Sequence, residues 1–230
     1  MRHRSLQAAL AGDGVSTLFI DMDGTLTDLA LDRLFFTETL PQCFADLSGA
    51  SLAEARRHVV AELAAIQGTL AWYSLPRLSS LFGLDLEALT EGLARAIVLQ
   101  PGAIEFLEQA GEHYRRVLVT NADPVVLAMK LRATGLAAWL DGVICAHHLG
   151  AAKEEAIFYE RLAALEPDCP LAGLLIDDNL AAVAAARRAG LQAVAIARPD
   201  RSRPARDITE GFAVENIAAL KDFLPERLTR

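Results

Sequence analysis

The chain has 230 residues, of which 53% are hydrophobic and 23% charged, with 15 Gly and 9 Pro. This ordinary composition excludes disordered, collagen-like and disulfide-scaffold proteins, and the length suits one large domain or one domain with a smaller inserted companion. The formal net charge of −8 argues against a nucleic-acid polymer as a partner but is compatible with a phosphorylated small molecule, because a metal ion can offset the charge locally.

The amino-terminal stretch and the cysteines predict the compartment. The stretch from Met1 runs into a short Ala/Leu segment that Asp13 interrupts, and this segment is too short for a secretory signal or a membrane span. The three cysteines lie far apart without a C-x-x-C pair, so neither a disulfide framework nor a zinc site is indicated. We expect a cytoplasmic chain without membrane contact, and no pattern points to a protein partner.

Five short apolar runs predict strands that are buried on both faces of a parallel sheet, because they lack the alternation of half-exposed strands. The runs cover residues 17–20, 116–119, 142–145, 174–176 and 193–196. Helical patterns follow at 124–134, 153–165 and 180–189. This alternation predicts an α/β fold with a doubly wound parallel sheet, in which functional residues gather at the carboxyl ends of the strands.

One long stretch, residues 29–100, shows helical periodicity and no buried strand, for example at 52–67 and 84–98. We predict that it is an all-helical cap inserted between the first two strands of a core formed by residues 1–28 and 101–230. The alternative is that these helices simply cover one face of the sheet.

Two carboxylates, Asp21 and Asp23, follow directly after the first predicted strand, in the string Asp-Met-Asp-Gly-Thr-Leu-Thr-Asp. Positions i and i+2 of an extended strand end point to one side, and two like charges there are costly unless a cation lies between them. Such oxygen ligands suit Mg²⁺, which also binds waters and substrate phosphate. Gly24 would let the backbone turn sharply beside a ligand. A polar turn is the alternative, but a turn does not require the whole string.

This string resembles the first motif of the haloacid dehalogenase superfamily, whose phosphatase members carry Asp-x-Asp-Gly-Thr. The other motifs of the superfamily follow in the expected order, as Thr120-Asn121 at a strand end, Lys153 opening a helix, and Asp177-Asp178 at another strand end. The resemblance covers essentially the whole chain and implies a Rossmann-like core. The dehalogenases lack the second acid of the first motif, so Asp23 favours phosphate-ester hydrolysis over carbon–halogen cleavage.

The resemblance implies catalytic roles that the chemistry of the residues supports. Asp21 is the expected nucleophile, which forms an aspartyl-phosphate, and Asp23 is the expected general acid and base. Thr120 and Asn121 would bind phosphate oxygens. Lys153 would neutralise charge on the nucleophile and the transition state, and a solvated lysine at a helix start is the alternative for this residue.

The resemblance also implies a magnesium ion. Its expected ligands are a carboxylate oxygen of Asp21, the backbone carbonyl of Asp23, and Asp178, while Asp177 is either a ligand or a neighbour of the ion. Acids from two separate strands that meet at one sheet edge favour a metal over an unpaired acidic cluster.

A narrower resemblance concerns the substrate. Segments 28–32, 68–75, 127–131 and 134–136 resemble the bacterial purine 5′-nucleotidases that act on GMP and IMP, which implies a purine mononucleotide as the substrate. Trp72 and Tyr73 would line the base or ribose side of the pocket, because aromatic faces stack on purines, and packing within the cap is the alternative. The charged residues that could contact the nucleotide are Arg33, Arg77 and Lys130.

Some positions depart from the pattern of this family. Asp123 stands where the nucleotidases usually carry His and would add negative charge near the phosphate, Ala151-Ala152-Lys153 lacks the usual Pro, and Asn179 stands where Ser is common. These departures leave open a phosphatase or phosphomutase of a small metabolite, such as phosphoglycolate or a sugar phosphate. A non-catalytic binding or regulatory protein is a further alternative, which the complete set of motif residues disfavours.

Overall fold

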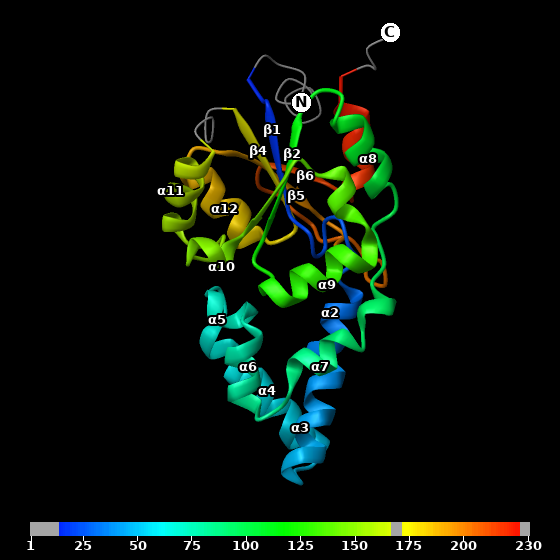
Figure 1. Ribbon diagram of the computed structural model, residues 1–230, viewed down its shortest axis with the longest axis vertical. Helices are drawn as coiled ribbons and strands as arrows, with labels where there is room; N and C mark the ends of the chain where they lie inside the picture. Colours follow the sequence, from blue (N-terminus) through cyan, green and yellow to red (C-terminus); the bar gives the residue numbers. More distant parts are fainter. Residues whose placement is uncertain (1–13, 167–171, 226–230) are drawn as a thin grey trace.

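The computed structural model describes residues 14–166 and 172–225 (Figure 1). The amino-terminal stretch around Asp13 and the third cysteine, Cys169, lie outside the described residues. Within the described ranges, no helix combines the length and the apolar character that crossing a bilayer requires.

Parallel strands form one six-stranded sheet in the order β3-β2-β1-β4-β5-β6. The strands are β1 (Thr17–Ile20), β2 (Arg115–Thr120), β3 (Gly142–Cys145), β4 (Gly173–Asp177), β5 (Gln192–Ile196) and β6 (Phe212–Val214). The strand order reverses between β1 and β4, which makes the carboxyl end of β1 the place where such sheets bind ligands. The predicted α/β fold class is therefore confirmed, and the predicted strands correspond to β1 through β5. The predicted burial on both faces is wrong for β3, because it is an edge strand in which only Cys145 is buried.

Alternate residues of β1 pack against helices on opposite faces of the sheet, which explains why the strand is continuously apolar. Leu18 and Ile20 belong to a core shared with α8, α9 and η4, whereas Phe19 belongs to a core shared with α11 and α12. The helices of these layers are α8 (Ala103–Ala110), α9 (Pro124–Thr134), η3 (Leu136–Trp139), α10 (Ala146–Leu149), α11 (Ala156–Leu165), α12 (Leu180–Arg188) and η4 (Ile217–Phe223).

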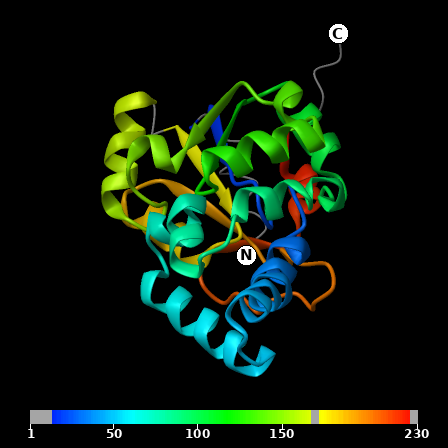
Figure 2. The same ribbon diagram turned by 60° about the horizontal axis from the view of Figure 1, so that its bottom comes forward.

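The chain between β1 and α8 is helical and has a core of its own. Its elements are α2 (Ala30–Leu34), η1 (Phe35–Thr39), α3 (Leu40–Ser48), α4 (Leu52–Ile66), α5 (Leu70–Tyr73), α6 (Leu75–Phe82), α7 (Leu86–Glu91) and η2 (Ala94–Ala96). Phe35, Val59 and Phe82 are among the residues of its separate apolar cluster. Figures 1 and 2 show α3 to α7 beyond the carboxyl ends of the strands, and neither face of the sheet is covered by them.

Two predicted helices have different bounds in the structure. The helix predicted at 84–98 is divided into α7 and η2, because Gly92 ends α7. The helix predicted to open at Lys153 begins only at Ala156, after Glu155. The backbone N–H of Lys153 donates instead to Oδ1 of Asn121 at 2.9 Å, so this residue lies in a turn that faces β2.

The two linkers between the helical segment and the sheet run side by side. The backbone N–H of Asp28 donates to the carbonyl of Val98 at 2.8 Å, and that of Gln100 donates to the carbonyl of Leu26 at 2.8 Å. The side chain of Gln100 also donates to the carbonyl of Pro199 at 2.7 Å. The helical segment therefore leaves the core and returns to it at one point.

Candidate active site

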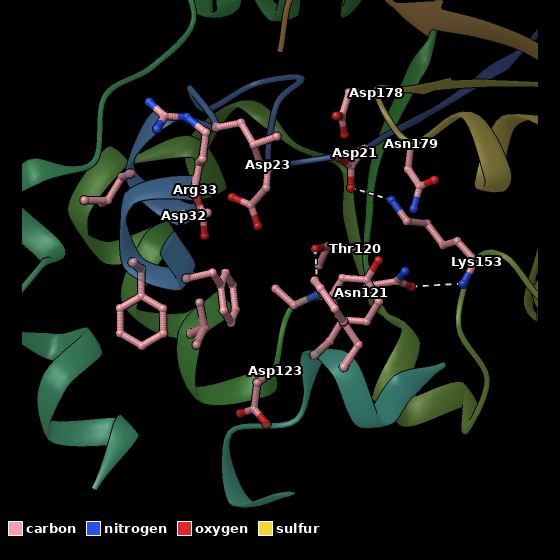
Figure 3. A pocket seen from close by; sticks show the side chains of 18 of the residues that line it. Asp21, Asp23, Asp32, Arg33, Thr120, Asn121, Asp123, Lys153, Asp178 and Asn179 are labelled. Carbon is pink, nitrogen blue, oxygen red and sulfur yellow. Dashed lines mark hydrogen bonds and ion pairs between the residues drawn. The ribbon is translucent and has the colours of Figure 1, made fainter. Parts of the chain in front are cut away.

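A cavity of about 700 Å³ lies between the carboxyl ends of the strands and the helical segment. This volume is typical of sites for small molecules. The structure brings every predicted site residue into its lining: Asp21, Asp23, Trp72, Tyr73, Thr120, Asn121, Lys153, Asp177 and Asp178. Figure 3 shows that the polar residues come from several different segments of the chain.

The buried ammonium of Lys153 connects the ends of two adjacent strands. It binds Oδ1 of Asp21, which follows β1, and Oδ2 of Asp177, the last residue of β4, at 2.7 Å. Burial alone would lower the pKa of Lys153, but the charges of Asp177 and Asp21 outweigh burial and hold that pKa well above its usual range. A charged lysine therefore lies against the carboxylate that the family resemblance predicts to be the nucleophile.

Three buried acids, Asp21, Asp177 and Asp178, offer carboxylate oxygens that all lie within 4.8 Å of one another. Burial raises the pKa of each carboxyl, and for Asp178 burial and the neighbouring charge of Asp177 raise it to about 7. Closely spaced acids with raised pKa values are the donor set that a divalent cation stabilises, since the cation offsets both the burial and the repulsion. The residues present therefore fit a divalent cation.

Asp177 and Asp178 differ in their hydrogen bonding. Asp177 accepts from Lys153 through one oxygen and from the backbone N–H of Asn179, at 2.8 Å, through the other. The carboxylate of Asp178 has an ion pair with Arg206 at 3.8 Å. Beside Asp178 lies Gly24, at φ +82°, where an added Cβ would approach the carboxyl carbon of Asp178 to 2.7 Å. The backbone thus leaves room around Asp178 that any other residue at position 24 would fill.

Glu154 joins side chains from three parts of the chain, and the sequence did not single it out. Its carboxylate accepts from the amides of Asn121 at 2.8 Å and Asn179 at 2.7 Å, and from the hydroxyl of Tyr73 at 2.8 Å. Nothing distinguished Glu154 in the sequence, because an acid in the first turn of a predicted helix is ordinary. Nearby, Thr120 accepts from the backbone N–H of Ala122 at 3.0 Å through its hydroxyl oxygen, so its own proton can be donated elsewhere.

Asp123, which was expected to add negative charge near the phosphate site, lines the cavity, and backbone N–H groups bind both oxygens of its carboxylate. One oxygen of this buried carboxylate accepts from the backbone N–H of Val125 at 3.0 Å and the other from that of Leu75 at 3.0 Å. Asp123 therefore caps the amino terminus of α9 and binds the first residue of α6, where a negative charge is favourable. Figure 3 shows it directed away from Asp21 and Lys153.

Aromatic side chains line the side of the cavity that belongs to the helical segment. Phe35, Phe36, Trp72 and Tyr73 all contribute to it. The rings of Phe36 and Trp72 have centroids 5.9 Å apart, and those of Phe35 and Phe36 are 5.2 Å apart. The predicted aromatic pair therefore both packs within the helical segment and faces the cavity.

The charged residues considered as nucleotide contacts are placed differently from one another. Arg33 lines the cavity but pairs with Asp200 at 2.6 Å. Arg77 is exposed and is not among the lining residues. Lys130 is buried and binds the carboxylates of Asp23 and Asp32, each at 2.6 Å, so its contacts are with the protein itself.

The family model that matches this chain describes a haloacid dehalogenase-like hydrolase and covers residues 15–190. A curated relative, the GMP/IMP nucleotidase YrfG of Escherichia coli (strain K12), is 35% identical over 193 residues, which are 83% of this chain and 87% of the relative. The protein of the same description in Shigella flexneri matches to the same extent.

Solved structures agree with the family assignment. A HAD phosphatase from Thermococcus onnurineus superposes with a TM-score of 0.71 at 26% identity, over 90% of this chain and 97% of that one. An L-2-haloacid dehalogenase from Xanthobacter autotrophicus has a TM-score of 0.59 at 18% identity, over 90% and 97% of the two chains. The second likeness establishes a common fold and nothing further.

Proposed function

Because this chain belongs to the haloacid dehalogenase-like hydrolases, we propose that it is a Mg²⁺-dependent phosphomonoesterase that acts through an aspartyl-phosphate on Asp21. We propose purine 5′-mononucleotides, GMP and IMP, as its substrates. The observation that carries the chemistry is the position of Asp21, which lies in contact with the ammonium of Lys153 and two positions before a second cavity-lining acid, Asp23.

In the first half of the reaction, a carboxylate oxygen of Asp21 attacks phosphorus while the bond from phosphorus to the leaving oxygen breaks. Asp23 donates a proton to that oxygen, so that a neutral alcohol departs. Lys153 offsets the negative charge at the attacking carboxylate and at the phosphoryl oxygens. The hydroxyl of Thr120 donates to a phosphoryl oxygen, and the backbone of Asn121 binds the same group.

In the second half, Asp23 acts as a base. It takes a proton from the water that attacks phosphorus, and the bond between phosphorus and Asp21 breaks. Inorganic phosphate leaves, the carboxylate of Asp21 is restored, and Asp23 is again protonated for the next turnover. Asp23 therefore donates a proton in the first half of the reaction and accepts one in the second.

The carboxylates of Asp21 and Asp178 and the backbone carbonyl of Asp23 would hold the magnesium ion. When bound, the ion supplies positive charge that lets a phosphate approach this acidic end of the cavity. Asp177 lies beside these ligands, with both its oxygens engaged by donors from the protein, Lys153 and Asn179. In this proposal Asp177 chiefly orients Lys153.

Two observations support a purine nucleotide as the substrate. The curated relative is described as a GMP/IMP nucleotidase. The aromatic wall of Phe35, Phe36 and Trp72 also suits a planar ring, whereas phosphoglycolate would leave this wall without contact. The lining also includes Thr37 and Gln67, whose polar groups could offer hydrogen bonds to the edge of a base.

We also propose that residues 29–100 form a cap over a core of residues 1–28 and 101–230, and that the cap excludes water from the bound phosphate. The placement of α3 to α7 beyond the ends of the strands supports this division. We propose a cytoplasmic location, which suits the free thiols of Cys43 and Cys145.

The test is phosphate release from a panel of nucleotides and sugar phosphates, each with Mg²⁺ and with a chelator. We expect release that depends on Mg²⁺ and is fastest for GMP and IMP, and none from the Asp21→Asn variant. No metal-dependent release from any phosphomonoester would contradict the enzyme proposal. A sugar phosphate hydrolysed faster than GMP and IMP would contradict only the substrate.

A further inference from the structure

A buried lysine in α9 is not used by the chemistry proposed above. Lys130 is 3% exposed, and its neighbours Leu127 and Met129 in the same helix are buried apolar residues. A buried ammonium is costly unless it is paired and hydrogen-bonded, so its partners indicate why it is there.

The partners of Lys130 come from two parts of the molecule. One is Asp23, which follows β1, and the other is Asp32 in α2, the first helix of the helical segment. Both contacts measure 2.6 Å from Nζ to a carboxylate Oδ1. The ammonium therefore connects the acid of the catalytic pair to the helix through which the chain enters the cap.

The same oxygen of Asp23 receives a second hydrogen bond. The hydroxyl of Thr27 lies 2.9 Å from Oδ1, which Lys130 also contacts. Within the described part of the chain, no hydrogen bond reaches Oδ2 of Asp23, and Figure 3 shows the carboxylate directed into the cavity. The hydroxyl of Thr27 also lies 3.1 Å from the carbonyl of Met22, so the ammonium of Lys130 is the donor that Oδ1 does not share with this carbonyl. Together the two contacts set the rotation of the carboxyl group and leave the other oxygen free to carry a proton.

We propose that Lys130 is a positioning residue, which fixes Oδ1 of Asp23 so that Oδ2 faces the leaving oxygen in the first half-reaction and the attacking water in the second. Asp32 holds Lys130 in this position from the cap side. The inference rests on the proposed function of Asp23 as general acid and base.

The test uses p-nitrophenyl phosphate, because nitrophenolate leaves without a proton. Formation of the aspartyl-phosphate from this substrate needs no acid, whereas its hydrolysis still needs Asp23 as a base. In the Lys130→Met variant, the first-turnover release of nitrophenolate should stay within about threefold of the wild type. The steady-state rate should fall between about 10-fold and 100-fold, because general base catalysis at the second step is impaired.

Three results would overturn the proposal. An unchanged steady-state rate would show that Lys130 does not position Asp23. An equal fall in the first-turnover and steady-state rates would indicate general damage to the site. A rise in KM alone would assign Lys130 to substrate binding. If the wild type itself releases no phosphate with Mg²⁺, the proposed function fails first, and the two failures are thereby distinguished.

A second variant keeps the test possible if the Lys130→Met variant does not fold. The double substitution Lys130→Met with Asp32→Leu replaces the buried charge and one of its partners by apolar groups, which proteins often tolerate well. We expect a folded protein with the same split between the two rates, and wild-type rates in it would overturn the proposal. The matched control is Arg132→Met in the same helix, which removes an exposed ion pair with Glu91 of α7 at 3.2 Å and should leave both rates unchanged.

Discussion

The hydroxyl of Tyr73 donates to the carboxylate of Glu154 at 2.8 Å, across 81 positions of the sequence, and this bond joins the helical segment to the core. In the Tyr73→Phe variant the ring remains and Glu154 keeps the amides of Asn121 and Asn179, so the loss is one hydrogen bond, about 1 kcal/mol. We expect kcat/KM for GMP to fall by about threefold to tenfold, together with a loss of at most about 1 kcal/mol in unfolding free energy.

A matched control separates this effect from a general loss of packing. The hydroxyl of Tyr159 donates to the carbonyl of Ala182 at 2.9 Å, inside the core. The Tyr159→Phe variant should lower the melting temperature and leave kcat/KM unchanged. If Tyr73→Phe behaved in the same way, the bond to Glu154 would have no role in closing the cavity over the substrate.

The aromatic wall predicts a difference between substrates. The Trp72→Ala variant removes a ring that faces the cavity and packs near Phe36. Loss of one stacking face, about 1 to 2 kcal/mol, should lower kcat/KM for GMP by about 5-fold to 30-fold. Ribose 5-phosphate has no base, so its kcat/KM should change by less than about twofold. Parallel assays of the two substrates check this, and equal losses would contradict a base-binding role.

The acidic cluster predicts how the metal-free protein responds to pH. Burial and the charge of Asp177 raise the pKa of Asp178 to about 7, so the folded protein holds this proton more tightly than the unfolded chain does. Stability from this group is complete below the unfolded pKa and is lost as the pH rises through about 7. We therefore expect the melting temperature in chelator to fall between about pH 4 and about pH 7 and to level off at higher pH.

Magnesium should reverse this trend, since it binds the ionised cluster. Its stabilising effect should be larger at about pH 8 than at about pH 6, as measured by thermal unfolding with and without the ion. The Asp178→Asn variant removes the titrating group, and its melting temperature should depend less on pH. A steeper dependence in that variant would show that another group governs the transition.

The conformation and close surroundings of Gly24 predict that replacing this residue weakens metal binding. Its φ of +82° and the approach of an added Cβ to 2.7 Å from Asp178 and 2.8 Å from Pro199 make Gly24→Ala both strained and crowded. We expect an affinity for Mg²⁺ lowered by at least about tenfold and a loss of about 1 to 3 kcal/mol in unfolding free energy.

The control for this prediction is Gly135→Ala. Gly135 also has a positive φ, +69°, but an added Cβ there has nothing within 4 Å. That variant should lose stability through backbone strain, about 1 kcal/mol, and should bind Mg²⁺ like the wild type. Equal metal affinities in the two variants would contradict the role given to the space beside Asp178.

Much of this fold follows from local sequence signals. Strands buried on both faces are continuous apolar runs, so β1 and β4 were recognisable, and the polar residues after them marked the edge where the site lies. The strand β6 was missed because it has three residues and only one of them, Val214, is buried. Edge strands of this kind carry too little apolar sequence to be distinguished from a loop.

The sequence predicted which residues form the site better than it predicted the contacts between them. The positions of Asp21 and Lys153 in ordered motifs indicated that they would meet. The ion pair between Lys130 and Asp32 depends instead on how α9 and α2 pack against each other. No sequence pattern predicts that packing. Asp123 shows the same limit, since no sequence pattern indicated that its carboxylate would accept hydrogen bonds at the starts of both α6 and α9.

The paired linkers have a consequence for how such a protein can diverge. Since the N–H of Asp28 bonds to the carbonyl of Val98, the two ends of the intervening helical segment lie side by side. A short turn could join them without moving β1 or β2, and so could a helical segment of another size. Recombination at this junction would exchange the aromatic wall as one unit, while Asp21, Lys153 and Asp178 stayed in place. The substrate preference could therefore change without a change in the residues of the reaction.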